Sequence, residues 1–170
     1  MKILIGCETS GIVRNAFIDN GHDAWSCDIL PADDQTNRHI QDDIRNVLKM
    51  EAWDLLMVAH PPCTRLCNSG VRWLHKAPPG KTVQEMWEEL DEGAALFSDL
   101  WNADVPRIAI ENPIMHKHAK ARIKNFKPFA QSVQPYEFAD SVEAEDNVSK
   151  RTCLWLKNLP LLQKTSELSR

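Results

Sequence analysis

Short apolar segments that end on polar residues alternate with helix-like segments along this chain. Segments 2–6, 22–28 and 53–59 have the length and apolar content of buried strands. Between the first two, segment 12–17 carries apolar side chains at helical spacing, and segment 82–101 does so over five turns after a capping box. This alternation predicts a Rossmann-like α/β fold, with a mainly parallel sheet covered by helices on both faces.

Several weaker patterns complete the predicted order of elements. A Pro- and Asp-rich loop precedes a helical turn near Val47, and the Gly-, Asn- and Pro-containing segment 64–80 is typical of a long mobile loop. Further strands are expected at 106–110, 133–138 and 152–156.

Length and composition limit the class of protein. A chain of 170 residues with 43% hydrophobic content supports one core, so we expect one domain over 1–158 and a tail over 159–170. The formal charge of −4 argues against a protein coated in positive charge. Five scattered cysteines, no signal peptide and no run of roughly 18 apolar residues predict a soluble cytoplasmic protein without membrane contact.

Polar residues follow the predicted strands at the points where the strands end. In parallel sheets, ligands bind outside the carboxyl ends of the strands, so such residues are expected to converge on one crevice. The residues in question are Glu8, Asp28, Asp43, Cys63 and Glu111.

The acid at the end of the second strand, Asp28, stands where a nucleotide ribose is commonly held. The turn from Gly6 to Gly11 is small and polar, but it is not the dinucleotide fingerprint and it has no phosphate-binding lysine. The pattern therefore favours a nucleoside-like cofactor without phosphates. An ordinary strand-to-helix turn is an equally good interpretation of the turn alone.

The sequence His60-Pro61-Pro62-Cys63 follows the clearest strand. Two prolines stop the strand and fix the backbone, which would hold the Cys63 thiol in a defined direction over the crevice. We therefore interpret Cys63 as a nucleophile. The other cysteines in apolar surroundings, Cys7, Cys27 and Cys153, are interpreted as small core side chains.

With these motifs in this order, the sequence resembles the DNA (cytosine-5)-methyltransferases, which use S-adenosylmethionine. Its last part, from Gln134 to Leu156, also resembles short methylase-like proteins common in bacteriophages and prophages, which implies the cytoplasm of a bacterial host. The resemblance implies the methyltransferase form of the Rossmann-like fold. The matching pieces are Ser10-Gly11, Asp28-Ile29, Asp43-Ile44, Asp54 leading to Pro61-Pro62-Cys63, Glu111-Asn112 and Lys150-Arg151 before an apolar strand.

The resemblance also implies roles for individual residues. Cys63 would add to carbon 6 of cytosine, Glu111 would protonate or hydrogen-bond ring nitrogen 3, and Arg151 would orient the base or steady Glu111. Asp28 would bind the ribose and Asp43 the adenine amino group. The implied residues of the S-adenosylmethionine site are Cys7, Glu8, Ser10, Gly11, Asp28, Ile29, Asp43, Ile44 and Pro62.

The chain departs from the family's pattern in two respects. Gly6-Cys7-Glu8 stands where a Phe-x-Gly is usual, and no target-recognition domain follows Arg151. Contact with DNA would then depend on the basic stretch from His116 to Lys127, which is equally typical of a solvated helix face, or on a partner chain.

Three functions remain open from the sequence. The first is cytosine methylation in DNA, the second is the same chemistry on a free cytosine nucleotide, and the third is a non-catalytic relative of the fold. A zinc site is a further alternative. Its ligands would be His60, Cys63, Cys67 and His75, although their spacing is not a standard finger pattern and we expect no metal.

Overall fold

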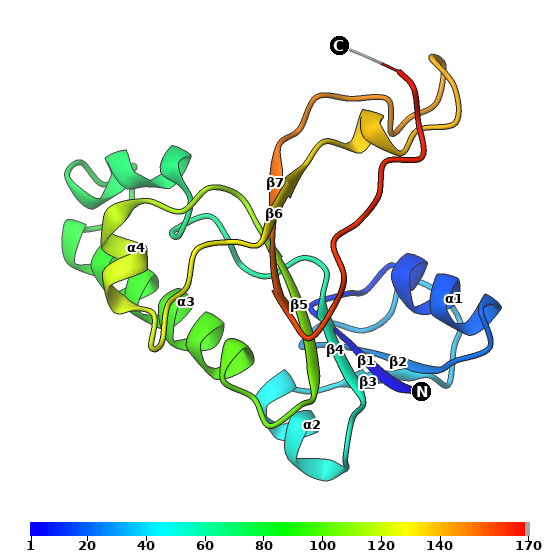
Figure 1. Cartoon of the computed structure of the whole chain (residues 1–170). Coiled ribbons are helices and arrows are strands. Elements are labelled where there is room, and N and C mark those ends of the chain that lie inside the picture. The colour runs from blue at the N-terminus through cyan, green and yellow to red at the C-terminus, as the bar shows by residue number, and fades with distance from the viewer. Residues whose placement is uncertain (169–170) are drawn as a thin grey trace.

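Seven strands form one mixed sheet in the order β3-β2-β1-β4-β5-β7-β6 (Figure 1). This computed structural model describes residues 1–168. Strands β1 to β5 pair in parallel, whereas β7 is antiparallel to both of its neighbours. The strands are β1 (Lys2–Gly6), β2 (Asp23–Asp28), β3 (His39–Gln41), β4 (Leu55–Val58), β5 (Arg107–Asn112), β6 (Gln131–Val133) and β7 (Thr152–Lys157).

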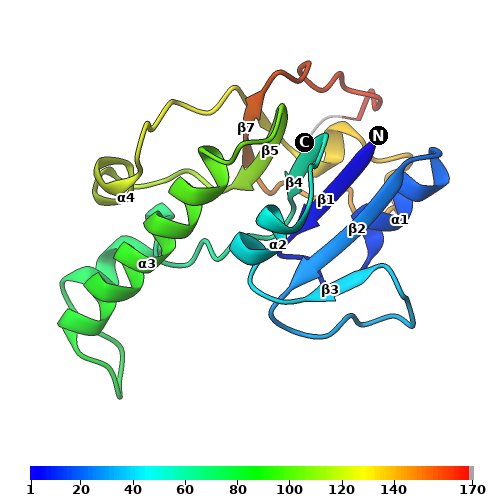
Figure 2. The ribbon, with the colours of Figure 1, turned by 90° about the horizontal axis from the view of Figure 1, so that it is seen from below.

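Helices cover the sheet from both sides. Figure 2 shows α1 on one side of the sheet and α2 and α3 on the other. No helix within residues 1–168 is long and apolar enough to cross a membrane. The α-helices are α1 (Ile12–Asp19), α2 (Ile44–Met50), α3 (Val83–Trp101) and α4 (Lys117–Arg122), and two 3-10 helices are η1 (Asn68–Leu74) and η2 (Pro135–Glu137).

Strand β1 explains why the core has two halves. Its side chains alternate, so that Ile3 and Ile5 pack with the α1 side while Leu4 packs with the α2 and α3 side. All three are fully buried, as expected for a parallel strand with helices on both faces. The expected α/β architecture is confirmed at this level.

The strand order reverses between β1 and β4. The chain leaves β1 toward β2 and β3 on one side, and later continues from β4 to β5 on the other. In open parallel sheets such a reversal opens a crevice at the carboxyl ends of the two central strands. Residues that follow β1 and β4 therefore border the crevice.

Two sequence-based predictions of local structure are wrong. The expected strand over 133–138 is instead β6 followed by η2, because Pro135 has no N–H for a strand ladder and the Glu137 carboxylate accepts from the Gln134 N–H at 2.8 Å. The expected loop over 64–80 contains η1, in which Gly70 and Leu74 are buried.

The segment that follows β7 contacts the domain. Leu159 packs against the α1 side of the core, and Gln131 exchanges two hydrogen bonds with the backbone of Leu162. The N–H groups of Thr165 and Ser166 both donate to the Glu137 carbonyl. The expected tail over 159–170 is thus held along β6 and η2 in its described part, while Ser169 and Arg170 lie outside the described residues.

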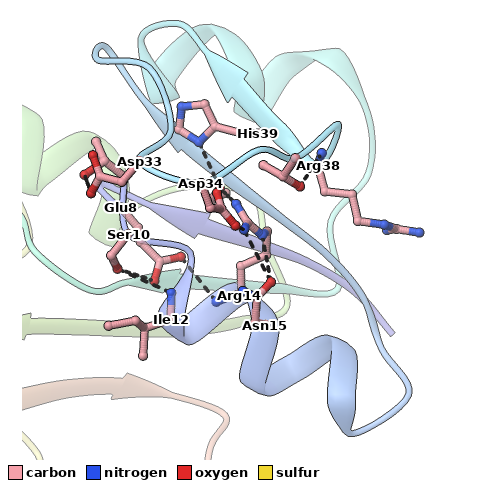
Figure 3. A network of polar contacts seen from close by, with 12 residues as sticks. Glu8, Ser10, Ile12, Arg14, Asn15, Asp33, Asp34, Arg38 and His39 are labelled. Atoms are coloured by element: carbon pink, nitrogen blue, oxygen red, sulfur yellow. Dashed lines mark hydrogen bonds and ion pairs between the residues drawn. The ribbon is translucent and has the colours of Figure 1, made fainter.

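The turn between β1 and α1 is built on buried charged side chains (Figure 3). Glu8 is 1% exposed, and its carboxylate accepts from the N–H groups of Val13 at 2.7 Å and Arg14 at 3.2 Å. Arg14 is fully buried, donates to Ser26 at 2.8 Å and forms an ion pair with Asp34. Glu8 therefore satisfies two of the free donors of the first turn of α1.

Gly11 lies at the entry to α1 with φ of 72°, and a Cβ there would lie 2.8 Å from the Arg14 guanidinium carbon. Gly21 has φ of 79° with open space around it. Gly21→Ala should cost about 1 kcal/mol of unfolding free energy from backbone strain alone, and Gly11→Ala about 2–4 kcal/mol because the buried Arg14 network must also shift. Urea denaturation of both variants measures the difference, and equal losses would contradict a network role for Gly11.

Candidate functional site

A cavity of about 270 Å³ opens at the point where the strand order reverses. Its walls come from the ends of β1, β2 and β4, from the start of α2 and from α3. The residues that line it are Cys7, Cys27, Asp28, Ile29, Asp42, Asp43, Ile44, Arg45, His60, Pro62 and Leu96.

The predicted cofactor residues divide into two groups. Glu8, Ser10 and Gly11 belong to the turn before α1, where Glu8 is committed to backbone donors and the Ser10 hydroxyl accepts from the Ile12 N–H at 3.3 Å. The other six line the cavity: Cys7, Asp28, Ile29, Asp43, Ile44 and Pro62.

Carboxylates dominate the polar wall of this cavity. Asp28 accepts from the Leu30 N–H at 3.0 Å, and Asp43 caps α2 by accepting from the Arg45 N–H at 2.9 Å. The Arg45 guanidinium also pairs with Asp43, and this pairing holds the pKa of the Asp43 carboxyl below its usual range. With Asp42 also in the wall, three acids face one arginine. Such a cavity suits hydroxyl groups and cations and disfavours phosphates.

The two thiols in the cavity are not nucleophiles at neutral pH. Burial, reinforced by the neighbouring acids, raises the pKa of Cys7 to about 12, and burial raises that of Cys27 to about 12. Both side chains are therefore protonated and apolar in character. Cys27 and Cys153 are fully buried in the core, in keeping with their interpretation as small core side chains.

The segments that follow β4 and β5 pair with each other beyond the sheet. Cys67 forms an isolated antiparallel bridge with Met115, the Asn68 N–H donates to the Ile114 carbonyl at 3.0 Å, and the His116 N–H donates to the Leu66 carbonyl at 3.1 Å. Because β4 and β5 are neighbours in parallel, this pairing continues their contact beyond the sheet. The half-buried Cys63 lies just before the first paired segment, and the half-buried Glu111 lies near the end of β5, just before the second.

The charge of Glu111 acts on the Cys63 thiol. Burial is the largest cause of a raised pKa at Cys63, and the charges of Cys67 and Glu111 raise it further, while Lys150 lowers it. Burial also raises the pKa of Glu111, against an opposing effect of Lys150. The Thr152 hydroxyl donates to the Glu111 carboxylate. A carboxyl group of this kind holds a proton at higher pH than an exposed one.

Arg151, the third predicted catalytic residue, is exposed, and its charge acts on Cys153. The cation whose charge acts on Cys63 and Glu111 is Lys150. In the sequence, Lys150 stands out only as the neighbour of Arg151.

A larger groove of about 810 Å³ adjoins the cavity and shares Arg45, Pro62 and Leu96 with it. Pro62 and Thr64, the residues on either side of Cys63, both line this groove. Within residues 1–168, Cys63 and Glu111 are not among the lining residues of either space. A substrate that reaches Cys63 would thus lie at the edge where the two spaces meet.

The basic stretch from His116 to Lys127 includes residues with structural tasks. His116 is 4% exposed, caps α4 by accepting from the Ala119 N–H at 3.1 Å, and contacts the Arg65 carbonyl at 2.7 Å. Arg122 forms an ion pair with Asp91 of α3. Lys117 and Lys120 of this stretch are exposed, so their side chains are accessible to a partner.

The residues proposed for a zinc site do not gather in one place. Over residues 1–168, no cluster of three or more His, Cys, Asp or Glu side chains has the geometry to hold a metal ion. His60 lines the 270 Å³ cavity, while Cys67 is buried with its sulfur 3.0 Å from the Ser69 hydroxyl.

The chain matches no protein-family model and no curated protein sequence.

The electrostatic effect of Glu111 on Cys63 has a measurable consequence. Glu111→Gln removes a negative charge that disfavours the thiolate, so the pKa of Cys63 should fall and its alkylation by iodoacetamide at pH 8 should accelerate by roughly twofold to fivefold. Peptide mass spectrometry measures the rate at Cys63. Glu92→Gln, which removes a charge from the groove wall, is the control and should leave the rate unchanged. An alkylation rate in Glu111→Gln equal to that of the unmodified chain would contradict an effect of Glu111 on the pKa of Cys63.

Proposed function

We propose that this protein is an S-adenosylmethionine-dependent methyltransferase that acts on carbon 5 of cytosine, in DNA, through a covalent adduct on Cys63. One observation carries the proposal. The segment after β4 carries Cys63, on which the charge of the half-buried Glu111 acts, and also supplies Pro62 to the acid-lined cavity at the strand-order reversal. A thiol after β4 and a carboxyl group near the end of the neighbouring β5 thus accompany the cavity, which supports a nucleophile and a proton donor in these two positions.

The cavity fits the nucleoside part of S-adenosylmethionine. Ile29 is 70% exposed at its rim, and with Pro62 and Leu96 it offers apolar surface for a planar ring. Asp28 is placed to accept from ribose hydroxyls. A volume of about 270 Å³ is at the low end for ligand sites, which suits the nucleoside rather than the whole cofactor.

The charge of the cavity also suits this cofactor. S-adenosylmethionine carries a sulfonium and no phosphate, and it supplies an electrophilic methyl group when bound. Three acids against one arginine favour a cation over a phosphate-bearing dinucleotide. The same reasoning explains why the turn before α1 needs no phosphate-binding lysine.

The reacting residues would divide the chemistry as follows. The Cys63 thiolate forms a bond to carbon 6 of cytosine, and the ring electrons shift so that carbon 5 takes the methyl group. Glu111 donates a proton or hydrogen bond to ring nitrogen 3 as negative charge develops there. Loss of the carbon-5 proton to a base then returns electrons to the ring, breaks the bond to sulfur and releases Cys63 as a thiolate.

A free cytosine nucleotide is the second candidate substrate. The formal charge of −4 favours it, because binding of a long polyanion is opposed by net negative charge. The exposed lysines of α4, which follows the Glu111 segment, favour DNA, and a partner chain could add target recognition.

Methyl transfer tests the proposal directly. Incubation with labelled S-adenosylmethionine and duplex DNA should label the DNA, and Cys63→Ala should lower the rate by at least about a thousandfold because no adduct can form. Glu111→Gln should lower it by roughly a hundredfold or more. Deoxycytidine nucleotides form a second arm. Label in the nucleotide alone would identify a free cytosine nucleotide as the substrate. Label in neither would contradict the proposed methyltransferase activity.

Cofactor binding is tested separately by calorimetry. Asp28→Asn should weaken S-adenosylmethionine binding by about tenfold or more, because hydrogen bonds to a charged group contribute about 1.5–3 kcal/mol. Asp19→Asn makes the same charge change on an exposed position of α1 and should leave the affinity unaltered. If the unmodified protein binds no S-adenosylmethionine, the proposed activity is contradicted and the protein is a non-catalytic relative of this fold.

A further inference from the structure

The rim of the 270 Å³ cavity includes a turn over residues 28–30 that exposes two large apolar side chains. Ile29 is 70% exposed and lines the cavity, and Leu30 is 58% exposed. The turn begins where β2 ends, and the Asp28 carboxylate accepts from the Leu30 N–H at 3.0 Å. Because burial in the core does not hold these apolar side chains, polar contacts of the backbone must fix the turn.

Strand β3 supplies those contacts. It pairs in parallel with the end of β2, and its residues His39 and Gln41 share one face because they are two positions apart. The His39 Nε2 lies 3.0 Å from the Leu30 carbonyl oxygen. The Gln41 side-chain amide donates to the Ile29 carbonyl at 3.2 Å. Side chains of one short edge strand thus hold the carbonyl groups of both exposed residues.

The tautomer of His39 follows from its partners. A carbonyl oxygen only accepts, so Nε2 carries the proton of the neutral ring and donates to Leu30. The bare Nδ1 then accepts from the Ser26 hydroxyl, at 2.9 Å. The Ser26 oxygen in turn accepts from the buried Arg14 guanidinium at 2.8 Å, so that His39 joins the network of Arg14 (Figure 3). A continuous chain of hydrogen bonds therefore runs from α1 through β2 and β3 to the cavity rim.

We infer that His39 and Gln41 are positioning residues for the nucleoside of the cofactor, in an inference that rests on the proposed function for the identity of that ligand. By holding the two carbonyl groups, they keep the Ile29 side chain at the rim and the Asp28 carboxylate at the cavity wall. Asp28 uses Oδ1 for the Leu30 N–H, and within residues 1–168 its Oδ2 has no hydrogen-bond partner. That oxygen is available to a ribose hydroxyl.

Preorganisation connects these hydrogen bonds to ligand affinity. Fixing a loop costs conformational free energy, and a turn that is already fixed does not add this cost when the ligand binds. Loss of either side-chain donor would leave a carbonyl of the turn without its partner and allow other backbone conformations. In the described part of the chain, neither His39 nor Gln41 lines the cavity, so both would act through Asp28 and Ile29.

Calorimetry with S-adenosylmethionine at pH 8 tests the inference in variants of the full chain. His39→Phe keeps a ring but removes its nitrogens, and it should weaken binding by about threefold to tenfold, as expected for the loss of a neutral hydrogen bond. His39→Gln restores an N–H donor near the position of Nε2 and should recover the affinity to within about twofold. Gln41→Glu turns the donor into an acceptor and should weaken binding by about threefold or more.

Matched changes elsewhere serve as controls. Gln35→Glu makes the same amide-to-carboxylate change at an exposed position of the preceding loop, and His22→Phe makes the same ring change before β2. Both should leave the affinity unaltered. Nitrogen-15 NMR of the histidine rings at pH 8 adds a measurement without ligand. His39 should carry its proton on Nε2 alone, and Ser26→Ala should shift the Nδ1 signal because Nδ1 loses its donor.

Unaltered affinity in His39→Phe and Gln41→Glu would overturn the inference, as would a loss that His39→Gln does not reverse or a proton found on Nδ1 of His39. Thermal unfolding checks that each variant folds. Weakened binding in variants of a protein that binds S-adenosylmethionine but transfers no methyl group would refute the proposed activity alone. Normal methyl transfer with unaltered affinity in the variants would refute the roles of His39 and Gln41 alone.

Discussion

Strand β4 is the element on which the rest of this structure depends. It pairs in parallel with β1 on one side and β5 on the other, and its side chains Leu56 and Val58 are fully buried. Parallel pairing sets the carboxyl ends of three strands at one edge, so whatever follows them must meet there. Pro61 and Pro62 end the strand at that edge and direct the chain across it. The cavity and the position of Cys63 therefore have a common origin in the pairing of β4.

The main elements of the fold could be predicted because their signals are local. Apolar runs of strand length and the capping box of α3 are visible in the sequence, and the structure confirms β1, β4 and α3. The three-residue strand β3 could not be predicted, because it depends on edge pairing with Ser26 and Cys27 of β2. The expected strand at 133–138 failed for a related reason. Its apolar content resembles a strand, but Pro135 and the Glu137 cap favour a tight turn.

The sequence predicted which residues lie near the site, but it did not predict which of them line the cavity and which stabilise the fold. From the sequence, a carboxylate that follows a strand is interpreted as a ligand-binding residue. The sequence does not tell whether it lines a cavity or accepts hydrogen bonds from nearby backbone N–H groups. Asp28 lines the cavity, whereas Glu8, which also follows a strand, is consumed by the first turn of α1.

The surroundings of Pro62 have opposite electrostatic effects on a bound cation and on the Cys63 thiolate. The cavity on one side is rich in carboxylates, which suits a cationic cofactor, yet negative charge and burial disfavour a thiolate nearby. An ordinary cysteine is only a few per cent thiolate at pH 7, and the raised pKa of Cys63 reduces that fraction further. The population of the nucleophile thus limits the rate of any adduct.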